Sequence, residues 1–232
     1  GDTFSAVTET WNLSRNNPST QVETYSLANP KSPQHLATLK IIEREQLHAT
    51  RFDGDLLYAV TFFRIDPLWI IDLSDPANPK KVSELEIPGY STYIQPLDGR
   101  LVTIGLDNTA GWRTAVQLFD VQNPAKPALL SKVILGEQYS ASEANYDEKA
   151  FGVLPEDKLL LVPYSTSTAN GYFQGVHLID LERDTLRKRG AIEHELQPRR
   201  ATLHRNRILS VSGVELLSVD ATNRDRPLVV ST

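Results

Sequence analysis

One short segment of this 232-residue sequence gathers several side chains that can do chemistry. The segment SEANYDEKAF, residues 142–151, carries the carboxylates Glu143 and Asp147, followed at once by Glu148 and Lys149. Two carboxylates about 5–10 Å apart in an open cleft can act as acid and base in glycoside hydrolysis. The same groups can instead bind a polar ligand or a cation, or pair with arginines. Pairing with arginines would remove the best case for catalysis.

Most other reactive motifs are missing. The sequence has no cysteine, which excludes disulfides, thiolate nucleophiles and cysteine-ligated metal ions. It contains no G-x-S-x-G nucleophile elbow, no phosphate-binding P-loop and no dinucleotide-binding G-x-G-x-x-G motif. We therefore expect no cofactor.

The histidines and one acidic loop are the remaining candidates for metal ligation. The five histidines, at positions 35, 48, 177, 194 and 204, lack ligand spacing such as H-E-x-x-H, so we interpret them as surface or channel side chains. The loop GLDNTAGW, residues 105–112, offers Asp107 and Asn108 but lacks the alternating acids and final glutamate of an EF-hand loop. We favour a loop that exposes Trp112 over a calcium site, and expect no metal.

The charge balance argues against a nucleic-acid partner. The net charge is −5, whereas nucleic-acid-binding domains are usually basic. Eight Lys and Arg residues gather in 183–207, but no aromatic side chain lies among them to stack on bases. The stretch 137–157 has six acidic residues against one lysine. These two segments present opposite charge either to solvent or to a protein or polyanionic partner.

A repeated pattern shows which elements must position these side chains. An apolar run ends at a small polar residue, and a turn with two prolines often follows, as in IDLSDPANPKK, residues 71–81. The residues at the end of each run are Ser26, Asp72, Asp120, Asp180 and Ser218. Their spacing of 38–60 residues is typical of propeller blades, each a four-stranded sheet of about 40–50 residues.

Turn residues divide each unit into strands. Asp53–Gly54 separates two β-rich runs and predicts a tight hairpin, because glycine adopts positive φ without steric cost. Asp72 can accept a hydrogen bond from a nearby backbone amide, and Pro76 and Pro79 lack the amide that would continue a strand ladder. A unit therefore consists of strand A, a tight turn, strand B, a longer loop, strand C, a proline turn and strand D.

These patterns predict an all-β fold, a β-propeller of four-stranded antiparallel blades. About four and a half to five blades lie in a single domain, 1–232, with units at roughly 1–46, 47–88, 89–136, 143–195 and 198–232. The first unit lacks strand A. Either PLVVST, residues 227–232, pairs with the N-terminal strand and closes a five-bladed ring, or further blades precede Gly1. We favour the second, a larger propeller.

Two long segments strengthen this prediction. Residues 60–105 and 116–151, with the shorter FQGVHLID at 173–180, resemble a family of secreted prokaryotic proteins with a C-terminal β-propeller distantly related to WD40 repeats. The resemblance spans roughly 48–212 and implies a propeller fold, further blades upstream and an extracytoplasmic location, either secreted or in the cell envelope. One departure is Glu148, where the family often has histidine, so a role that needs an imidazole there is in doubt.

Strand A is the innermost strand of a propeller blade, so residues beside it face the channel mouth. This places a set of candidate ligand-binding residues there: Arg51, Tyr93, Glu143, Asp147, Lys149 and Arg200, with His48, Gln95 and His204 nearby. The loops between strands B and C add the aromatic candidates Trp112, Tyr172 and Phe173.

We expect an exported, non-catalytic scaffold that binds a protein or polysaccharide of the envelope or the exterior. The expected chain is a monomer without a transmembrane segment, because no apolar run approaches the roughly 20 residues that span a bilayer. One alternative is a glycan hydrolase or lyase that uses Glu143 and Asp147. Another is a structural spacer beside a catalytic domain.

Overall fold

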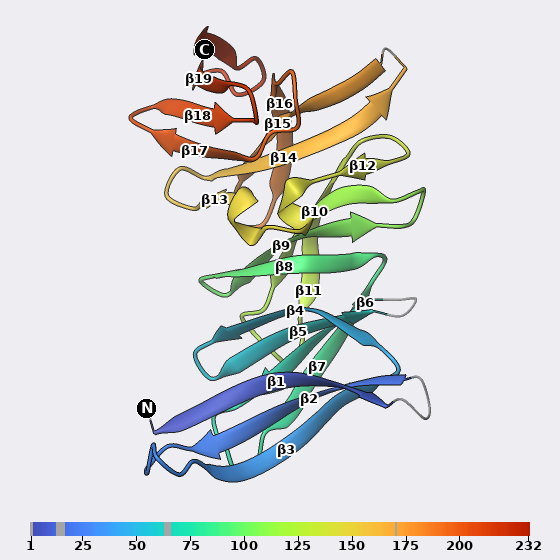
Figure 1. Ribbon diagram of the computed structural model, residues 1–232, viewed down its shortest axis with the longest axis vertical. Coiled ribbons are helices and arrows are strands. Elements are labelled where there is room, and N and C mark those ends of the chain that lie inside the picture. Colours follow the sequence, from blue (N-terminus) through green and yellow to red (C-terminus); the bar gives the residue numbers. More distant parts are fainter. Residues whose placement is uncertain (1, 13–16, 63–65, 170) are drawn as a thin grey trace.

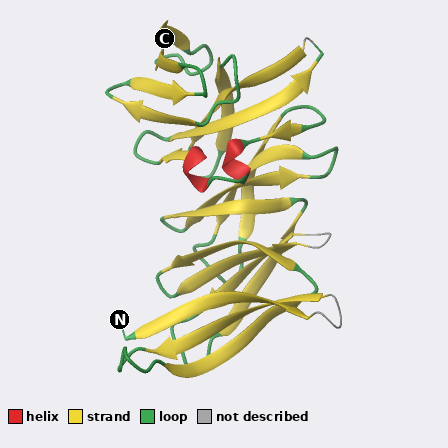
Figure 2. Cartoon of the chain, in the orientation of Figure 1, coloured by secondary structure: helices red, strands yellow, loops and turns green. Residues whose placement is uncertain are grey.

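The computed structural model describes residues 2–12, 17–62, 66–169 and 171–232. In this part of the chain, antiparallel strands form five sheets that follow one another in sequence order along the long axis of the molecule (Figure 1). The only helices among these residues are two single turns of 3-10 helix (Figure 2). The all-β prediction is therefore confirmed.

The strands of each sheet follow the chain from the inner to the outer edge. The first sheet has three: β1 (Thr3–Asn12), β2 (Asn17–Ser26) and β3 (Gln34–Glu43). The second has β4 (Gln46–Asp53), β5 (Leu56–Phe62), β6 (Asp66–Asp72) and β7 (Lys80–Ile87). The third has β8 (Tyr90–Leu97), β9 (Arg100–Asp107), β10 (Arg113–Asp120) and β11 (Ala128–Leu135).

The last two sheets continue this order. The fourth has β12 (Ser140–Ala141), β13 (Gly152–Leu154), β14 (Leu159–Thr168), β15 (Gly171–Leu181) and β16 (Leu186–Glu193). The fifth has β17 (Arg200–His204), β18 (Arg207–Val211), β19 (Leu216–Asp220) and β20 (Leu228–Ser231).

The core lies between neighbouring sheets, and the middle strands supply both sides of it. Leu57 and Ala59 of β5 pack toward the first sheet, whereas Tyr58 and Val60 of the same strand pack toward the third. Because both faces of such a strand are buried, its sequence is a continuous apolar run rather than an alternating one. This explains runs such as LWII, residues 68–71.

In three units, the turn that follows the repeated motif behaves as the sequence predicts. Asp72 Oδ1 accepts a hydrogen bond from the Ser74 amide (2.8 Å), and Asp120 Oδ1 accepts one from the Gln122 amide (2.9 Å). Asp220 does the same with the Thr222 amide, at 2.9 Å. In the fourth unit, Asp180 instead accepts hydrogen bonds from Arg189 and Arg224. The repeated motif is therefore a structural turn, as its proline content indicates.

The innermost strand of the fourth sheet is interrupted at the acidic segment. β12 and β13 both pair with β14, and the residues between them form the 3-10 turns η1 (Glu143–Asn145) and η2 (Glu148–Ala150). Ser142 accepts a hydrogen bond from the Ala144 amide (3.1 Å) and Asp147 one from the Lys149 amide (3.0 Å), which caps both turns. The candidate charged residues of this segment therefore lie in or beside the two turns rather than on a strand.

The two ends of the row of sheets do not meet. Among the described residues, β1 pairs only with β2 and β20 only with β19, and these strands lie at opposite ends of Figure 1. The pairing that would close a five-bladed ring is therefore not formed in this structure. No helix in the described ranges has the length and apolar character needed to cross a bilayer.

Two polar relays, each made of three hydrogen-bonded side chains, lie among the strands. In the second sheet, Trp69 Nε1 donates to Thr61 Oγ1 (3.0 Å), which donates to Glu45 Oε2 (2.6 Å). Between the last two sheets, His194, which directly follows β16 of the fourth sheet, lies between Glu215 (Nδ1–Oε1, 2.8 Å) and Ser210 of β18 (Nε2–Oγ, 2.7 Å).

The burial of two histidines corrects the prediction that they are surface or channel side chains. His194 and His177 are buried, both 5% exposed, rather than placed on the surface or in the channel. Burial, assisted by the charge of Lys188, lowers the pKa of His177 to about 4, so its imidazole is neutral at physiological pH. The sequence around a single histidine does not show whether its side chain is buried, so His177 and His194 could not be told apart from exposed histidines.

Candidate functional site

Four rings from two neighbouring sheets pack together at the end of the molecule that carries the loops between the second and third strands. His48 and Tyr90 lie 4.5 Å apart between ring centroids, and Phe62 lies 5.0 Å from Tyr90. Trp112 completes the group at 6.0 Å from Tyr90 and 6.4 Å from Phe62. We call these four residues the aromatic cluster. Trp112 remains 42% exposed, so the cluster presents an aromatic surface to solvent.

Strand register brings these rings together. His48 and Tyr90 lie near the beginnings of the inner strands β4 and β8, and Phe62 ends β5. Gly89, directly before Tyr90, has a φ of +96°, and a Cβ there would lie 1.9 Å from the Leu106 carbonyl oxygen. Only glycine fits this close approach of the two backbones, which sets the position of Tyr90.

The cluster is uncharged at neutral pH. Burial lowers the pKa of His48, and the nearby Glu9 carboxylate only partly offsets this effect. Burial also raises the pKa of Tyr90, with a further contribution from the neighbouring Tyr146 hydroxyl. Tyr146 belongs to the acidic segment 142–151 and is 87% exposed.

A buried ion network holds the loop that carries Trp112. Asp107 is 1% exposed and accepts hydrogen bonds from the Thr109 amide (3.1 Å), Arg113 Nη2 (3.1 Å) and Lys132 Nζ. Burial alone would raise the pKa of Asp107, but the hydrogen bonds from Lys132 and Thr109 outweigh it and lower the pKa to about 2. Asp107, which we considered as a calcium ligand and did not favour, is thus paired with two cationic side chains of the protein, Arg113 and Lys132.

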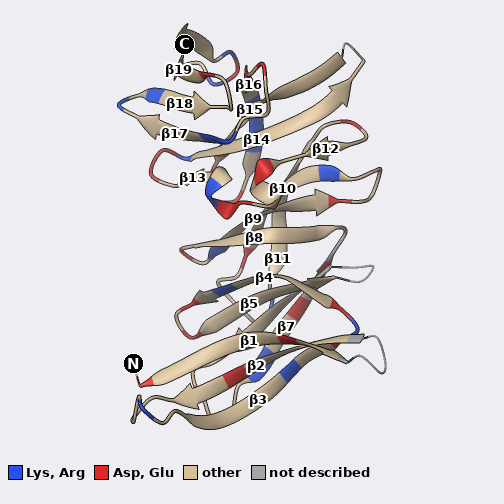
Figure 3. Ribbon diagram, in the orientation of Figure 1, with Lys and Arg blue, Asp and Glu red and all other residues tan. Residues whose placement is uncertain are grey.

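The candidate carboxylates pair with arginines of the next sheet. Glu143 Oε1 accepts a hydrogen bond from Arg199 Nη1 (2.6 Å), and Asp147 Oδ2 accepts one from Arg200 Nη2 (3.0 Å). Figure 3 shows the acidic turns next to the basic start of β17. Both acids are therefore engaged, and the acid–base alternative loses its best-placed residues.

The exposed pair between Asp147 and Arg200 is expected to contribute little to stability. Its side chains are 42% and 52% exposed, and exposed ion pairs typically contribute less than about 1 kcal/mol. Arg200→Gln should therefore change the free energy of unfolding in urea by no more than that amount. A larger loss would show that the pair fixes the inserted segment against β17.

Arg51 and Tyr93 also come together on the inner strands. The Arg51 guanidinium carbon lies 5.8 Å from the centroid of the Tyr93 ring, a cation–π geometry. The Tyr93 hydroxyl donates to Gln95 Oε1 (2.7 Å), and the ring meets Phe151 edge-on at 6.2 Å. Burial raises the pKa of Tyr93, while Arg51 opposes this shift and Glu148 adds to it.

Lys149 and Tyr172 stand apart from these groups. Lys149 is exposed on η2, and its backbone amide serves to cap that turn. Tyr172 is 64% exposed on β15 and makes no ring contact with any described aromatic residue, whereas its neighbour Phe173 packs on Tyr164 at 5.2 Å. The two loop aromatics predicted together, Trp112 and Tyr172, therefore do not form one aromatic surface.

Sequence reasoning missed Phe62 and Tyr90, the inner members of the aromatic cluster. Each occupies a strand end beside a loop, and the two belong to successive units. Aromatic residues at strand ends of consecutive repeats are the signal that would have pointed to them.

Two uncharacterised archaeal proteins match part of this chain. An uncharacterised protein of Archaeoglobus fulgidus is 39% identical over 102 residues, which is 44% of this chain and 16% of that protein. An uncharacterised protein of Methanocaldococcus jannaschii is 38% identical over the same length and the same shares. The chain thus spans only a small part of these archaeal relatives.

The family comparison covers far more of the chain. The model of a beta propeller domain matches residues 2–215, which include the first four sheets and β17 to β18 of the fifth. Because this match extends over most of the sequence, the chain belongs to the beta propeller domain family.

Proposed function

We propose that this chain is a non-catalytic binding scaffold whose ligand docks on the aromatic cluster. The observation that carries this proposal is the packing of His48, Phe62, Tyr90 and Trp112 across two sheets, with Trp112 partly open to solvent. A rigid base fixes the exposed ring in one orientation, so little conformational entropy is lost when a ligand stacks on it.

A polysaccharide of the cell envelope or exterior is the ligand class that fits this surface best. The cluster is uncharged at neutral pH, because burial lowers the pKa of His48 and raises that of Tyr90. An uncharged aromatic surface suits a ligand that offers flat apolar faces between polar groups. A protein partner is the competing class, and the experiment below separates the two.

Trp112→Ala is expected to weaken binding on a glycan array at least tenfold. This loss corresponds to about 1.4 kcal/mol, within the range for truncation of an interface aromatic residue. Phe52→Ala is the matched control, because Phe52 is similarly exposed at 44% but lies at the opposite end of β4 from His48. The wild-type protein and the control should bind alike.

Two results would refute the proposal in different ways. Equal binding by Trp112→Ala and wild type would show that the ligand contacts another surface. Absence of any glycan signal, together with capture of a protein that Trp112→Ala fails to retain, would replace the polysaccharide by a protein partner.

The proposal includes an extracytoplasmic, monomeric protein whose sheets form an arc of a larger propeller. The resemblance of residues 60–105 and 116–151 to secreted proteins supports the location. The open row of sheets in Figure 1, whose end strands β1 and β20 lie far apart, supports the larger ring. Cell fractionation tests the location, and light scattering during gel filtration tests the monomer.

A further inference from the structure

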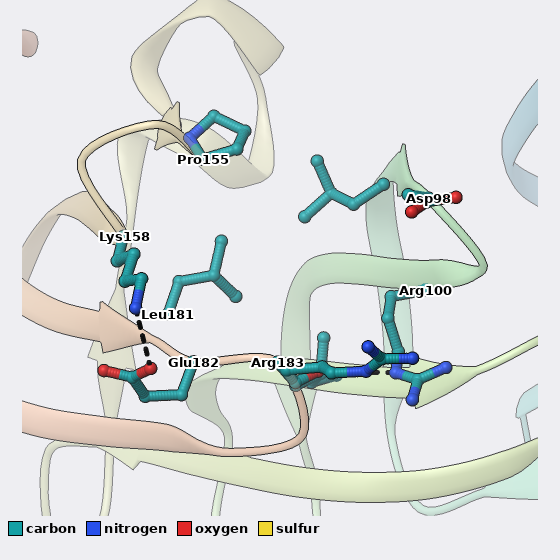
Figure 4. A pocket seen from close by; sticks show the side chains of 9 residues that line it. Asp98, Arg100, Pro155, Lys158, Leu181, Glu182 and Arg183 are labelled. Carbon is teal, nitrogen blue, oxygen red and sulfur yellow. Dashed lines mark hydrogen bonds and ion pairs between the residues drawn. The ribbon is translucent and has the colours of Figure 1, made fainter.

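A pocket of about 330 Å³ opens between the third and fourth sheets (Figure 4). It lies on the side of the sheets that carries the tight turns, whereas the aromatic cluster lies beside the loops between the second and third strands. Tight turns between β8 and β9 and between β13 and β14, and the turn after β15, form its rim. Its lining residues are Leu97, Asp98, Arg100, Leu118, Pro155, Lys158, Leu181, Glu182 and Arg183.

The interior of the pocket is apolar. Leu118 is fully buried and Leu181 is 8% exposed, and both belong to the core between the two sheets. Leu97 packs against the same core, and Pro155 closes the pocket from the neighbouring turn (Figure 4). These side chains offer a hydrocarbon surface for a compact ligand body.

Arg100 is fixed in the wall by the protein's own acids. Its Nη1 donates to Asp120 Oδ1 (2.8 Å) and its Nη2 to Asp184 Oδ1 (2.6 Å). Its Nε donates to the Arg183 carbonyl oxygen (3.3 Å), which ties the backbone of Arg183 to the pocket wall. Arg100 therefore positions the rim while its charge is already neutralised.

Two other cations at the rim are available to a ligand. The side chain of Arg183 is exposed and makes no ion pair or hydrogen bond with any described residue. Lys158 pairs with Glu182 at 3.6 Å, but both side chains are more than half exposed, so the pair is weak. The Asp98 carboxylate points away from Leu181 in Figure 4.

We propose that this pocket binds a small organic carboxylate with a compact hydrocarbon body. The carboxylate accepts a forked pair of hydrogen bonds from the Arg183 guanidinium, the geometry that arginine favours for this group. Lys158 adds a second positive charge, and the hydrocarbon body lies on Leu97, Leu118 and Leu181. This site is independent of the ligand of the aromatic cluster, since it lies on a different face.

Benzoate is the probe, and amide chemical shifts from heteronuclear NMR of the whole chain are the measurement. Saturable shifts with a millimolar dissociation constant are expected at Leu97, Asp98 and Leu181 to Arg183. Arg183→Gln should weaken benzoate about fivefold, the size expected for one exposed charge-assisted hydrogen-bond pair. Arg187→Gln is the matched control, because Arg187 is exposed on β16 outside the pocket.

Benzyl alcohol and acetate separate the two parts of the ligand. Benzyl alcohol lacks the charge and acetate lacks the ring, so both should bind at least fivefold more weakly than benzoate. Three outcomes would overturn the proposal: no saturable shifts at these amides, equal weakening by both arginine variants, or benzyl alcohol binding as tightly as benzoate.

Discussion

Asp107→Asn is expected to lower the free energy of unfolding at pH 7 by about 3 kcal/mol, the cost typical of breaking a buried ion pair. The asparagine keeps one carbonyl oxygen but places an amide donor toward Lys132 and Arg113. These cations are only 19% and 15% exposed, so both would lose their buried counter-charge. Urea unfolding followed by far-ultraviolet circular dichroism measures the difference.

The effect should depend on pH in a defined direction. The pKa of Asp107 is depressed to about 2, so its ionised form stabilises the fold above the unfolded-state pKa, near 4. This contribution amounts to about 2 kcal/mol and is lost as pH falls from about 4 through 2. The difference between wild type and Asp107→Asn should therefore shrink toward pH 2.

Asp72→Asn serves as the control for this prediction. Asp72 also ends a strand and accepts a backbone hydrogen bond, from Ser74, but no described side chain forms an ion pair with it. Its replacement should cost less than about 1 kcal/mol. If both variants lose the same free energy of unfolding at pH 7, the ion pairs of Asp107 with Arg113 and Lys132 contribute nothing to stability.

The network around Asp107 links stability to binding. Asp107 fixes Thr109 and Arg113 on the two sides of Trp112, so the loop that presents this ring depends on a buried charge. A mobile loop would lose the orientation of the ring and with it the low entropic cost of binding. We therefore expect Asp107→Asn to weaken the ligand of the aromatic cluster as well as the fold.

Turn chemistry explains why the strand pattern could be predicted. Gly54, which follows Asp53 in the predicted hairpin turn, adopts a φ of +56°. Gly99 follows Asp98 in the equivalent turn of the next unit and adopts a φ of +68°. The apolar runs at 68–71 and 159–162 are buried on both faces because sheets pack on each side of them. Local residue types were sufficient for these features.

The candidate site depends on contacts that local patterns do not encode. Asp147 and Arg200 are 53 positions apart, and Glu143 and Arg199 are 56 apart. Whether such charges pair or stay free depends on how the fourth and fifth sheets pack. The division of the inner strand into β12 and β13 could not be predicted either. The polar composition of residues 142–151 is equally compatible with an ordinary loop and with a pair of 3-10 turns.

His194→Ala is expected to lower the free energy of unfolding by about 3 kcal/mol, since it combines a cavity with unsatisfied buried polar groups. The imidazole side chain is fully buried. Its loss leaves Ser210, which is also fully buried, and Glu215 without their shared partner. His204→Ala is the matched control: His204 is exposed on β17, in the sheet that also holds Ser210, and its replacement should cost less than about 0.5 kcal/mol.

The same variant distinguishes a structural relay from a catalytic one. The order Ser210, His194 and Glu215 resembles a nucleophile, base and orienting acid, yet Ser210 is fully buried. The nearby pocket of about 330 Å³ is lined by His194 and Glu215 but not by Ser210, so a substrate would not reach the hydroxyl. Ser210→Ala should thus reduce stability and leave no ester-hydrolysing activity to lose. Hydrolysis of a p-nitrophenyl ester by the wild type that Ser210→Ala abolishes would contradict this assignment.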